Sequence, residues 1–185
     1  MEVKGVAIRS NIIFFREKYG DYYSDFLKML DNDVKKIYSG DIDIREWYEI
    51  QRFYLDPMAF FAHVVNASDP IAFAREIGEY SASVTLTGVY KVFLLVATPK
   101  YILRKSSRLM KTFYNEAEAE AMEEGPNWFR LRILRFPKLN KMLEHRICAY
   151  SRRALELAHA KNVSYTIEKS ITNGDQHSII LFSWD

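Results

Sequence analysis

The sequence predicts an α+β protein, with an all-helical region over residues 1–113 followed by a ββαββ unit over residues 114–185. Three observations predict this fold. Apolar residues recur at helical spacing in the first region, and strand-favouring segments separated by turn residues follow it. Only 7 Gly and 5 Pro occur in 185 residues, which favours long regular elements. We therefore expect one domain over residues 1–185, with an antiparallel sheet packed on a long helix.

The helices of the first region are predicted from their capping residues. A helix that starts at Ser10 or Asn11 is expected to end at Tyr19-Gly20, because glycine suits a left-handed C-cap, and Asp21 then caps a second helix. Four further helices are predicted over Asp43–Leu55, from Asp56-Pro57, from Ser68-Asp69-Pro70 and from Pro99, and a buried helical stretch over Val84–Val96.

The second region is predicted to hold two hairpins on either side of one helix. The alternating run from Glu116 and the strand-favouring run from Trp128 to Phe136 flank a Gly-Pro-Asn turn, although the Ala/Glu run equally fits a helix. Apolar residues at helical spacing from Leu139 to Ala158 predict the helix. Two strands, Val163–Ile171 and Ser178–Trp184, are joined by an Asn-Gly turn.

Composition limits the function classes. The net charge of +2, from 26 basic and 24 acidic residues, argues against a nucleic-acid-binding protein, which needs a concentrated basic face. The single cysteine, Cys148, excludes an intrachain disulfide and favours a reducing, cytoplasmic location. We find no secretory signal and no transmembrane segment, because Val84–Val96 is too short and too polar to span a bilayer.

The central helices are rich in aromatic residues. Most of these are expected to be core, and part of this region is expected to line an apolar ligand pocket. Tyrosine hydroxyls need partners when buried, and an apolar pocket with a few polar groups is typical of small-molecule sites. A core histidine bonded to a carbonyl is the simpler interpretation of His63. The predicted ligand-binding residues are His63, Phe60, Phe61, Tyr80, Tyr90, Phe93 and Tyr101.

Other candidate groups favour structural interpretations. The four histidines have no metal-ligand spacing, and His145 and His159 are fourteen residues apart on one predicted helix. Cys148 is expected to be half-buried and inert. The glutamates from Glu116 to Glu120 are expected to face arginines across the hairpin. The basic stripe that starts at Arg104 is expected to be a solvated helix face, with a phosphate, lipid or acidic partner as the alternative.

Three segments carry a resemblance to a known superfamily. They are VKGVAIRSNIIFFREKYG at residues 3–20, the central helical stretch IGEYSASVTLTGVYKVFLLVATPKYILRKSSRLMKTFYN at residues 77–115, and the closing hairpin KSITNGDQHSIILFSW at residues 169–184. The chain resembles the superfamily of vinyl-reductase-type (4VR) domains, heme-nitric-oxide-binding domains and TRAPP trafficking subunits, and most closely an uncharacterised myxobacterial family. The resemblance implies a bacterial protein with a ligand between the helical half and the sheet.

Two departures from the superfamily pattern bear on cofactors. Many relatives have cysteines flanking the Gly-Asp turn, where this chain has Ser170 and Ser178, and serine is a poor ligand for soft metals. Heme-binding relatives use a histidine on the helix before the first strand and a Tyr-x-Ser-x-Arg clamp. Residues Pro99 to Tyr114 contain no histidine, and the clamp spacing is absent. No cofactor is therefore expected, and heme is disfavoured.

The resulting hypothesis is a non-catalytic sensor or regulatory module, expected to be dimeric, that binds an apolar or amphipathic small molecule. One alternative is a protein-interaction adaptor without a ligand, which uses the surface around Trp47 and Tyr48. Further alternatives are a heme-based gas sensor and, by the name of one related domain alone, an enzyme on a tetrapyrrole-like substrate. Solid packing between helices and sheet would favour the adaptor.

Overall fold

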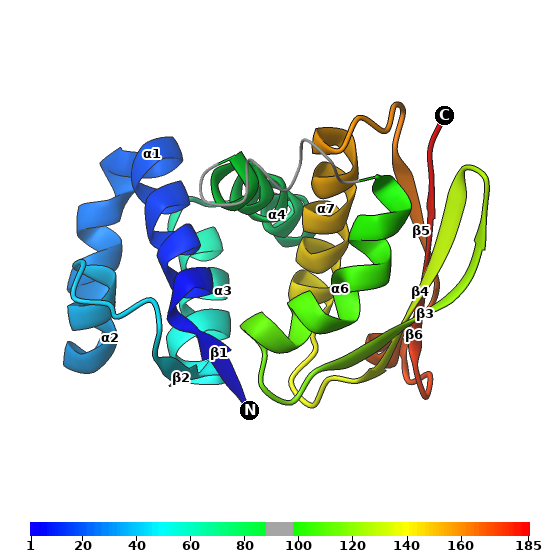
Figure 1. Ribbon diagram of the computed structural model, residues 1–185. Coiled ribbons are helices and arrows are strands. Elements are labelled where there is room, and N and C mark those ends of the chain that lie inside the picture. The colour runs from blue at the N-terminus through cyan, green and yellow to red at the C-terminus, as the bar shows by residue number, and fades with distance from the viewer. Residues whose placement is uncertain (88–97) are drawn as a thin grey trace.

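The computed structural model describes residues 1–87 and 98–185, apart from the side chains of residues 87, 106 and 107. Its elements lie in three groups (Figure 1). The N-terminal helices and a small sheet lie on one side, three helices lie in the middle, and a four-stranded sheet lies on the other side. This arrangement confirms the predicted α+β class, with a helical part followed by a ββαββ unit. The predicted stretch Val84–Val96 lies largely outside the described residues.

The elements follow one another along the chain without a long irregular segment between them in the described part. The first group holds β1 (Glu2–Lys4), α1 (Gly5–Met29), α2 (Asn32–Tyr38), β2 (Trp47–Glu49), a π-helix (Gln51–Leu55) and α3 (Asp56–Val64). The middle group holds α4 (Pro70–Thr87), α6 (Pro99–Phe113) and α7 (Lys141–Leu157). The sheet holds β3 (Glu118–Gly125), β4 (Trp128–Arg135), β5 (Ser164–Lys169) and β6 (Ser178–Ser183), with a 3₁₀ turn (Ile171–Asn173) before β6.

Side-chain caps explain where several helices begin. The Asp69 carboxylate accepts hydrogen bonds from the backbone N–H groups of Ile71 and Ala72 at 2.8 and 3.1 Å, as the sequence predicts. Thr98 caps α6 and Asn140 caps α7 in the same way. These bonds satisfy N–H groups that have no partner inside the helix, so the caps fix the starting points of α4, α6 and α7.

The helical half differs from its prediction in two places. The predicted helix Asp43–Leu55 is wrong, because residues 47–49 form β2, which pairs antiparallel with β1, and a π-helix follows. Pairing with a strand more than forty residues away overrides the local helical pattern there. The first helix begins at Gly5 and continues past Gly20, although Tyr19 has non-helical dihedral angles of −139° and 38°. The predicted break is therefore a kink.

The four-stranded sheet is antiparallel in the order β3-β4-β6-β5, so α7 connects β4 to β5. Buried residues alternate along β4 and β6, and Leu131 pairs with Ile180 across the two central strands. The turn before β6 uses Gly174 at a φ of 96°, a conformation that glycine adopts without strain. Glu120 forms an ion pair with Arg132 across the first hairpin, as predicted for this face.

The N-terminal strand joins the helical part to the segment that leads into the sheet. The backbone N–H of Glu2 donates to the Asn115 side chain at 2.8 Å, and Val3 bridges to Tyr114, so the N-terminal strand lies at the junction of the two regions. The predicted boundary at residue 113 stays a prediction.

Among the helices of residues 1–87 and 98–185, none is long and apolar enough to cross a membrane.

Candidate functional site

A cavity of about 230 Å³ lies between the helical part and the sheet. Helices α1, α4, α6 and α7, the π-helix and strand β4 all contribute to its wall. Most of the wall is apolar, and it includes Leu103, Met110, Phe113 and Leu131. The molecule thus has an apolar space at the junction where the resemblance implies a ligand, and pockets of this character are typical of small-molecule sites.

One part of the cavity wall is polar, and Arg146 is at its centre. This side chain comes from α7 and is only 4% exposed. Its guanidinium donates to the hydroxyls of Ser10 and Ser81, each at 3.2 Å, and lies 4.7 Å from the centre of the Tyr54 ring. Ser81 also donates to Ser10 at 3.1 Å. Four elements therefore bring their polar groups to one place in the apolar wall.

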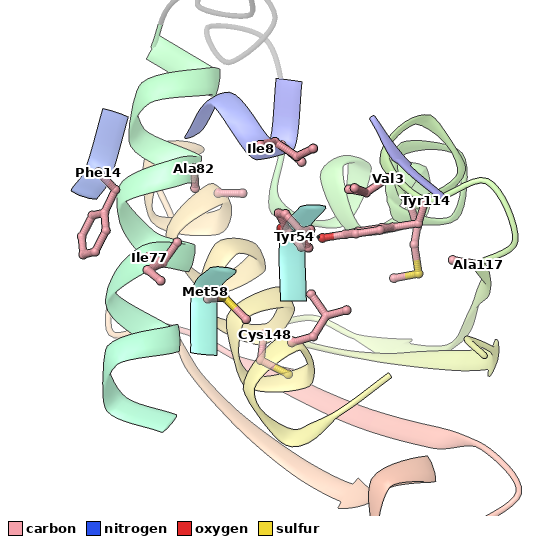
Figure 2. Packing of buried hydrophobic residues seen from close by; sticks show 14 of the residues in the cluster. Val3, Ile8, Phe14, Tyr54, Met58, Ile77, Ala82, Tyr114, Ala117 and Cys148 are labelled. Atoms are coloured by element: carbon pink, nitrogen blue, oxygen red, sulfur yellow. Dashed lines mark hydrogen bonds between the residues drawn. The ribbon is translucent and has the colours of Figure 1, made fainter. Parts of the chain in front are cut away.

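Two tyrosines extend this polar region. Tyr54 and Tyr114 point toward one another in Figure 2, and their hydroxyls are 3.2 Å apart. Burial raises the pKa of both phenols, well above 10 for Tyr114. Both side chains line the cavity as neutral hydrogen-bonding groups.

The predicted site residues of the first helices lie elsewhere. His63 is exposed on α3. Phe61 is buried in an aromatic cluster, stacked on Phe15 with ring centres 3.8 Å apart, and Phe60 packs beside Phe26 in the same cluster. None of the three predicted residues lines the cavity.

The other predicted site residues are not brought together with them. Tyr80 of α4 is half-buried, and its hydroxyl donates to the Glu17 carboxylate. Tyr101 of α6 is 43% exposed. Tyr90 and Phe93 lie outside the described residues. As ligand-binding residues these seven stay a prediction, and the described ones do not coincide with the cavity.

Arg146, Ser10 and Ser81 were missed by the sequence analysis. One signal could have found the arginine: it follows Leu143 by three residues and precedes Ala149 by three, so a charged residue stands on the apolar stripe of α7. The serines carry no such signal, because their role depends on how α1 packs against α4 and α4 against α7.

The remaining sequence candidates have structural environments. Cys148 is fully buried, and burial raises the pKa of its thiol, so the inert interpretation holds. The expectation that His145 and His159 share one helix is wrong. His159 lies beyond the end of α7 and has a φ of 72°. Arg104 of the basic stripe pairs with Glu124.

Comparison with protein-family models and with curated proteins gave no match. Solved structures of H-NOX proteins are similar to the chain. An H-NOX protein from S. oneidensis in the Fe(II)NO ligation state has a TM-score of 0.76 at 9% identity, over 98% of this chain and 99% of that one. The unliganded Fe(II) H-NOX protein from K. algicida has a TM-score of 0.72 at 11% identity, over 98% and 96%.

A third structure is the oxygen complex of an oxygen-binding H-NOX domain related to soluble guanylate cyclases. Its TM-score is 0.74 at 12% identity, over 98% of this chain and 95% of that one. These similarities contradict the expectation that no cofactor is involved, because two of the structures are Fe(II) forms of H-NOX proteins and a further similar structure concerns heme distortion in the H-NOX family. At nearly full coverage of both chains, the similarity shows that this chain has the H-NOX fold.

Proposed function

We propose that the chain is a ligand-binding sensor domain whose ligand occupies the cavity between helices and sheet. The cavity itself carries the proposal: about 230 Å³ of mostly apolar space with a buried polar cluster on one wall. A ligand there contacts α1, α4, α6 and α7 at once. It therefore stabilises one packing of these helices against the sheet, and a partner protein or a second copy reads the change.

The cavity also bears on the adaptor alternative. A protein that only binds other proteins needs no internal space, and close packing is the normal state of an interior. We propose that a partner protein binds the surface around Trp47 and Tyr48 when the ligand is bound. We further propose that the chain forms a dimer. We also propose that it is related to 4VR domains, TRAPP subunits and a myxobacterial family. The domain is proposed to bind without catalysis.

A second candidate function is heme-based gas sensing. The similar structures include Fe(II), Fe(II)NO and oxygen complexes, and one concerns heme distortion, which favours heme as the cofactor. Protein ligands of heme iron are histidine, cysteine thiolate, methionine or tyrosine. The residues around the cavity therefore decide whether the group fits.

The described cavity wall does not fit heme iron well. No histidine stands on α6 or anywhere along the cavity wall within residues 1–87 and 98–185, and the sequence has none in 88–97. Burial raises the pKa of the Tyr54 and Tyr114 phenols and so disfavours the phenolate that would bind iron. Met110 offers a thioether, which cytochromes c use together with a histidine, and the described wall has no histidine. The cavity is also below the range of about 300–1,000 Å³ that drug-sized ligands occupy.

The test uses protein purified from heme-supplemented cells. Native mass spectrometry and an absorption spectrum are recorded first, followed by thermal unfolding with a panel of apolar metabolites. A ligand at a hundred times its Kd adds about 2.7 kcal/mol, which raises the Tm of a chain this size by roughly 5–11 °C. A co-purified apolar molecule, or such a shift, supports the sensor with an organic ligand.

Two variants make the test specific for the cavity. Ala154→Leu adds volume to the cavity wall, whereas Ala160→Leu adds the same volume at a buried position outside it. We expect the first to abolish the ligand shift and the second to retain it. A Soret band with one heme per chain would support the gas sensor in place of the organic ligand. An empty protein that shows no shift with any compound would refute both.

A further inference from the structure

The polar wall of the cavity holds a positive charge that no carboxylate balances. Arginine stays protonated in proteins, so Arg146 is a cation at 4% exposure. Its contacts are neutral: the hydroxyls of Ser10 and Ser81, the sulfur of Met58 at 3.8 Å and the Tyr54 ring. A guanidinium has five N–H donors, so these contacts leave capacity for a further acceptor.

No acidic side chain in residues 1–87 or 98–185 forms an ion pair with Arg146, and the sequence of 88–97 contains neither Asp nor Glu. The buried acid nearest along α7 is Glu144, whose carboxylate is occupied by the hydroxyls of Ser170, Thr172 and Ser178. Glu144 therefore binds the turn before β6 and not the cavity. Buried charges are normally paired, because an unpaired one is costly to bury.

Two serine hydroxyls fix the position of the Arg146 guanidinium. Ser10 donates its own hydroxyl proton to the carbonyl of Ala7 at 2.7 Å, so its oxygen accepts from Ser81 and from Arg146. Ser81 likewise accepts from Arg146. The two serines therefore hold the guanidinium at the cavity wall, where Arg146, Ser10 and Ser81 all stand among the lining residues.

We propose that the ligand of this cavity is a medium-chain carboxylate, with its carboxylate on Arg146 and its hydrocarbon chain along the apolar wall. Arginine and a carboxylate form paired, charge-assisted hydrogen bonds. A cavity of about 230 Å³ is smaller than the pockets of about 300–1,000 Å³ that drug-sized ligands occupy, so the hydrocarbon chain is of medium length. This inference rests on the proposed function and adds the chemical class of the ligand.

The competing interpretation is that Arg146 only ties α1, α4 and α7 together through Ser10 and Ser81. The two interpretations differ in one measurable quantity. A structural arginine gives no preference for a carboxylate over an alcohol of the same chain length. A carboxylate site prefers the acid by the value of a charge-assisted bond.

The experiment is calorimetric titration of the full chain at pH 7.5 with octanoate and, separately, with 1-octanol. We expect wild-type protein to bind octanoate at least about tenfold more tightly than 1-octanol. Arg146→Met keeps the length of the side chain without its charge, and it should bring the ratio of the two affinities close to one. Arg153→Met is the matched control on α7, since Arg153 bonds Ser83 and Glu156 outside the cavity, and it should keep the wild-type ratio.

The outcomes separate this inference from the proposed function. Equal binding of both compounds by wild-type protein overturns the carboxylate assignment and leaves an apolar ligand site in place. Binding of neither overturns the carboxylate assignment, whereas the proposed function falls only if the wider panel and the mass spectrum are also negative. If Arg146→Met does not fold, the wild-type comparison still decides, and the carboxyl ¹³C signal of labelled octanoate reports contact with the guanidinium directly.

Discussion

The crossing of α4 and α7 places Gly78 directly against the backbone of α7. A Cβ atom at this position would lie 2.3 Å from the carbonyl oxygen of Arg146 and 3.1 Å from the backbone nitrogen of Tyr150. Ordinary contacts of a Cβ begin near 3.4 Å, so Gly78→Ala forces the helices apart by about 1 Å. Backbone atoms cannot rotate out of the way as side chains do.

The expected magnitude follows from two opposing effects. Alanine stabilises a helix by about 1 kcal/mol relative to glycine, whereas overpacking a close interface costs about 1–3 kcal/mol. With a backbone clash the upper end applies, so we expect Gly78→Ala to lower the free energy of unfolding by about 2 kcal/mol. For a chain of this size that is a fall in Tm of roughly 4–8 °C.

Gly20→Ala is the matched control, because Gly20 is also helical and has nothing within 4 Å of its added Cβ. It should raise the free energy of unfolding by about 0.5–1 kcal/mol. Urea unfolding followed by circular dichroism measures both variants. If Gly78→Ala is as stable as wild type or as Gly20→Ala, α4 and α7 do not approach as closely as described. Separation would also lengthen the 3.2 Å bond from Arg146 to Ser81, so the octanoate preference should weaken in the same variant.

Three further predictions concern buried groups. Tyr54→Phe and Tyr114→Phe should each lower the free energy of unfolding in urea by about 1–2 kcal/mol, because each change leaves one buried hydroxyl without its partner. The double variant should lose less than the sum of the two single losses, and strict additivity would contradict the shared bond. Cys148 should not react with Ellman's reagent at pH 8 until the chain unfolds, since its thiol is fully buried and its pKa is raised by burial; rapid reaction of native protein would show that it is accessible. Glu144→Gln should lower the free energy of unfolding by about 1–3 kcal/mol, because three hydroxyls donate to this buried carboxylate, whereas Glu123→Gln at the surface should change it by less than about 0.5 kcal/mol; equal effects would argue against the cluster.

Local signals in the sequence were sufficient for elements that depend on neighbouring residues. The cap at Asp69 and the turn at Gly174 work through bonds and dihedral angles within a few residues, so their pattern predicts them. The strand at Trp47–Glu49 could not be predicted in this way. It exists because it pairs with Glu2–Lys4, and its own sequence is equally suited to a helix.

The site was harder to predict than the fold for the same reason. An aromatic-rich helix has more than one apolar face, and periodicity does not say which face meets a cavity. Phe61 therefore lies in an aromatic cluster of the N-terminal part, whereas Tyr54, seven residues earlier, lines the cavity. The polar cluster joins Arg146 to Ser10, which is 136 residues away in the sequence. Only the packing of α1 against α4, and of α4 against α7, brings these two residues together.

A shared fold does not require a shared ligand, because ligand chemistry depends on the side chains that line the site. The H-NOX structures that resemble this chain are Fe(II) proteins, and such a site needs a strong iron ligand. Here the strongest polar group on the wall is a cation, which repels a metal ion and attracts an anion. Replacing Arg146 by histidine would remove that charge at neutral pH and supply an imidazole. If Arg146→His acquires a Soret band that wild-type protein lacks, the fold can accept heme and Arg146 is the residue that selects against it. If wild-type protein already shows the band, heme occupies the cavity and the inference of a medium-chain carboxylate ligand fails.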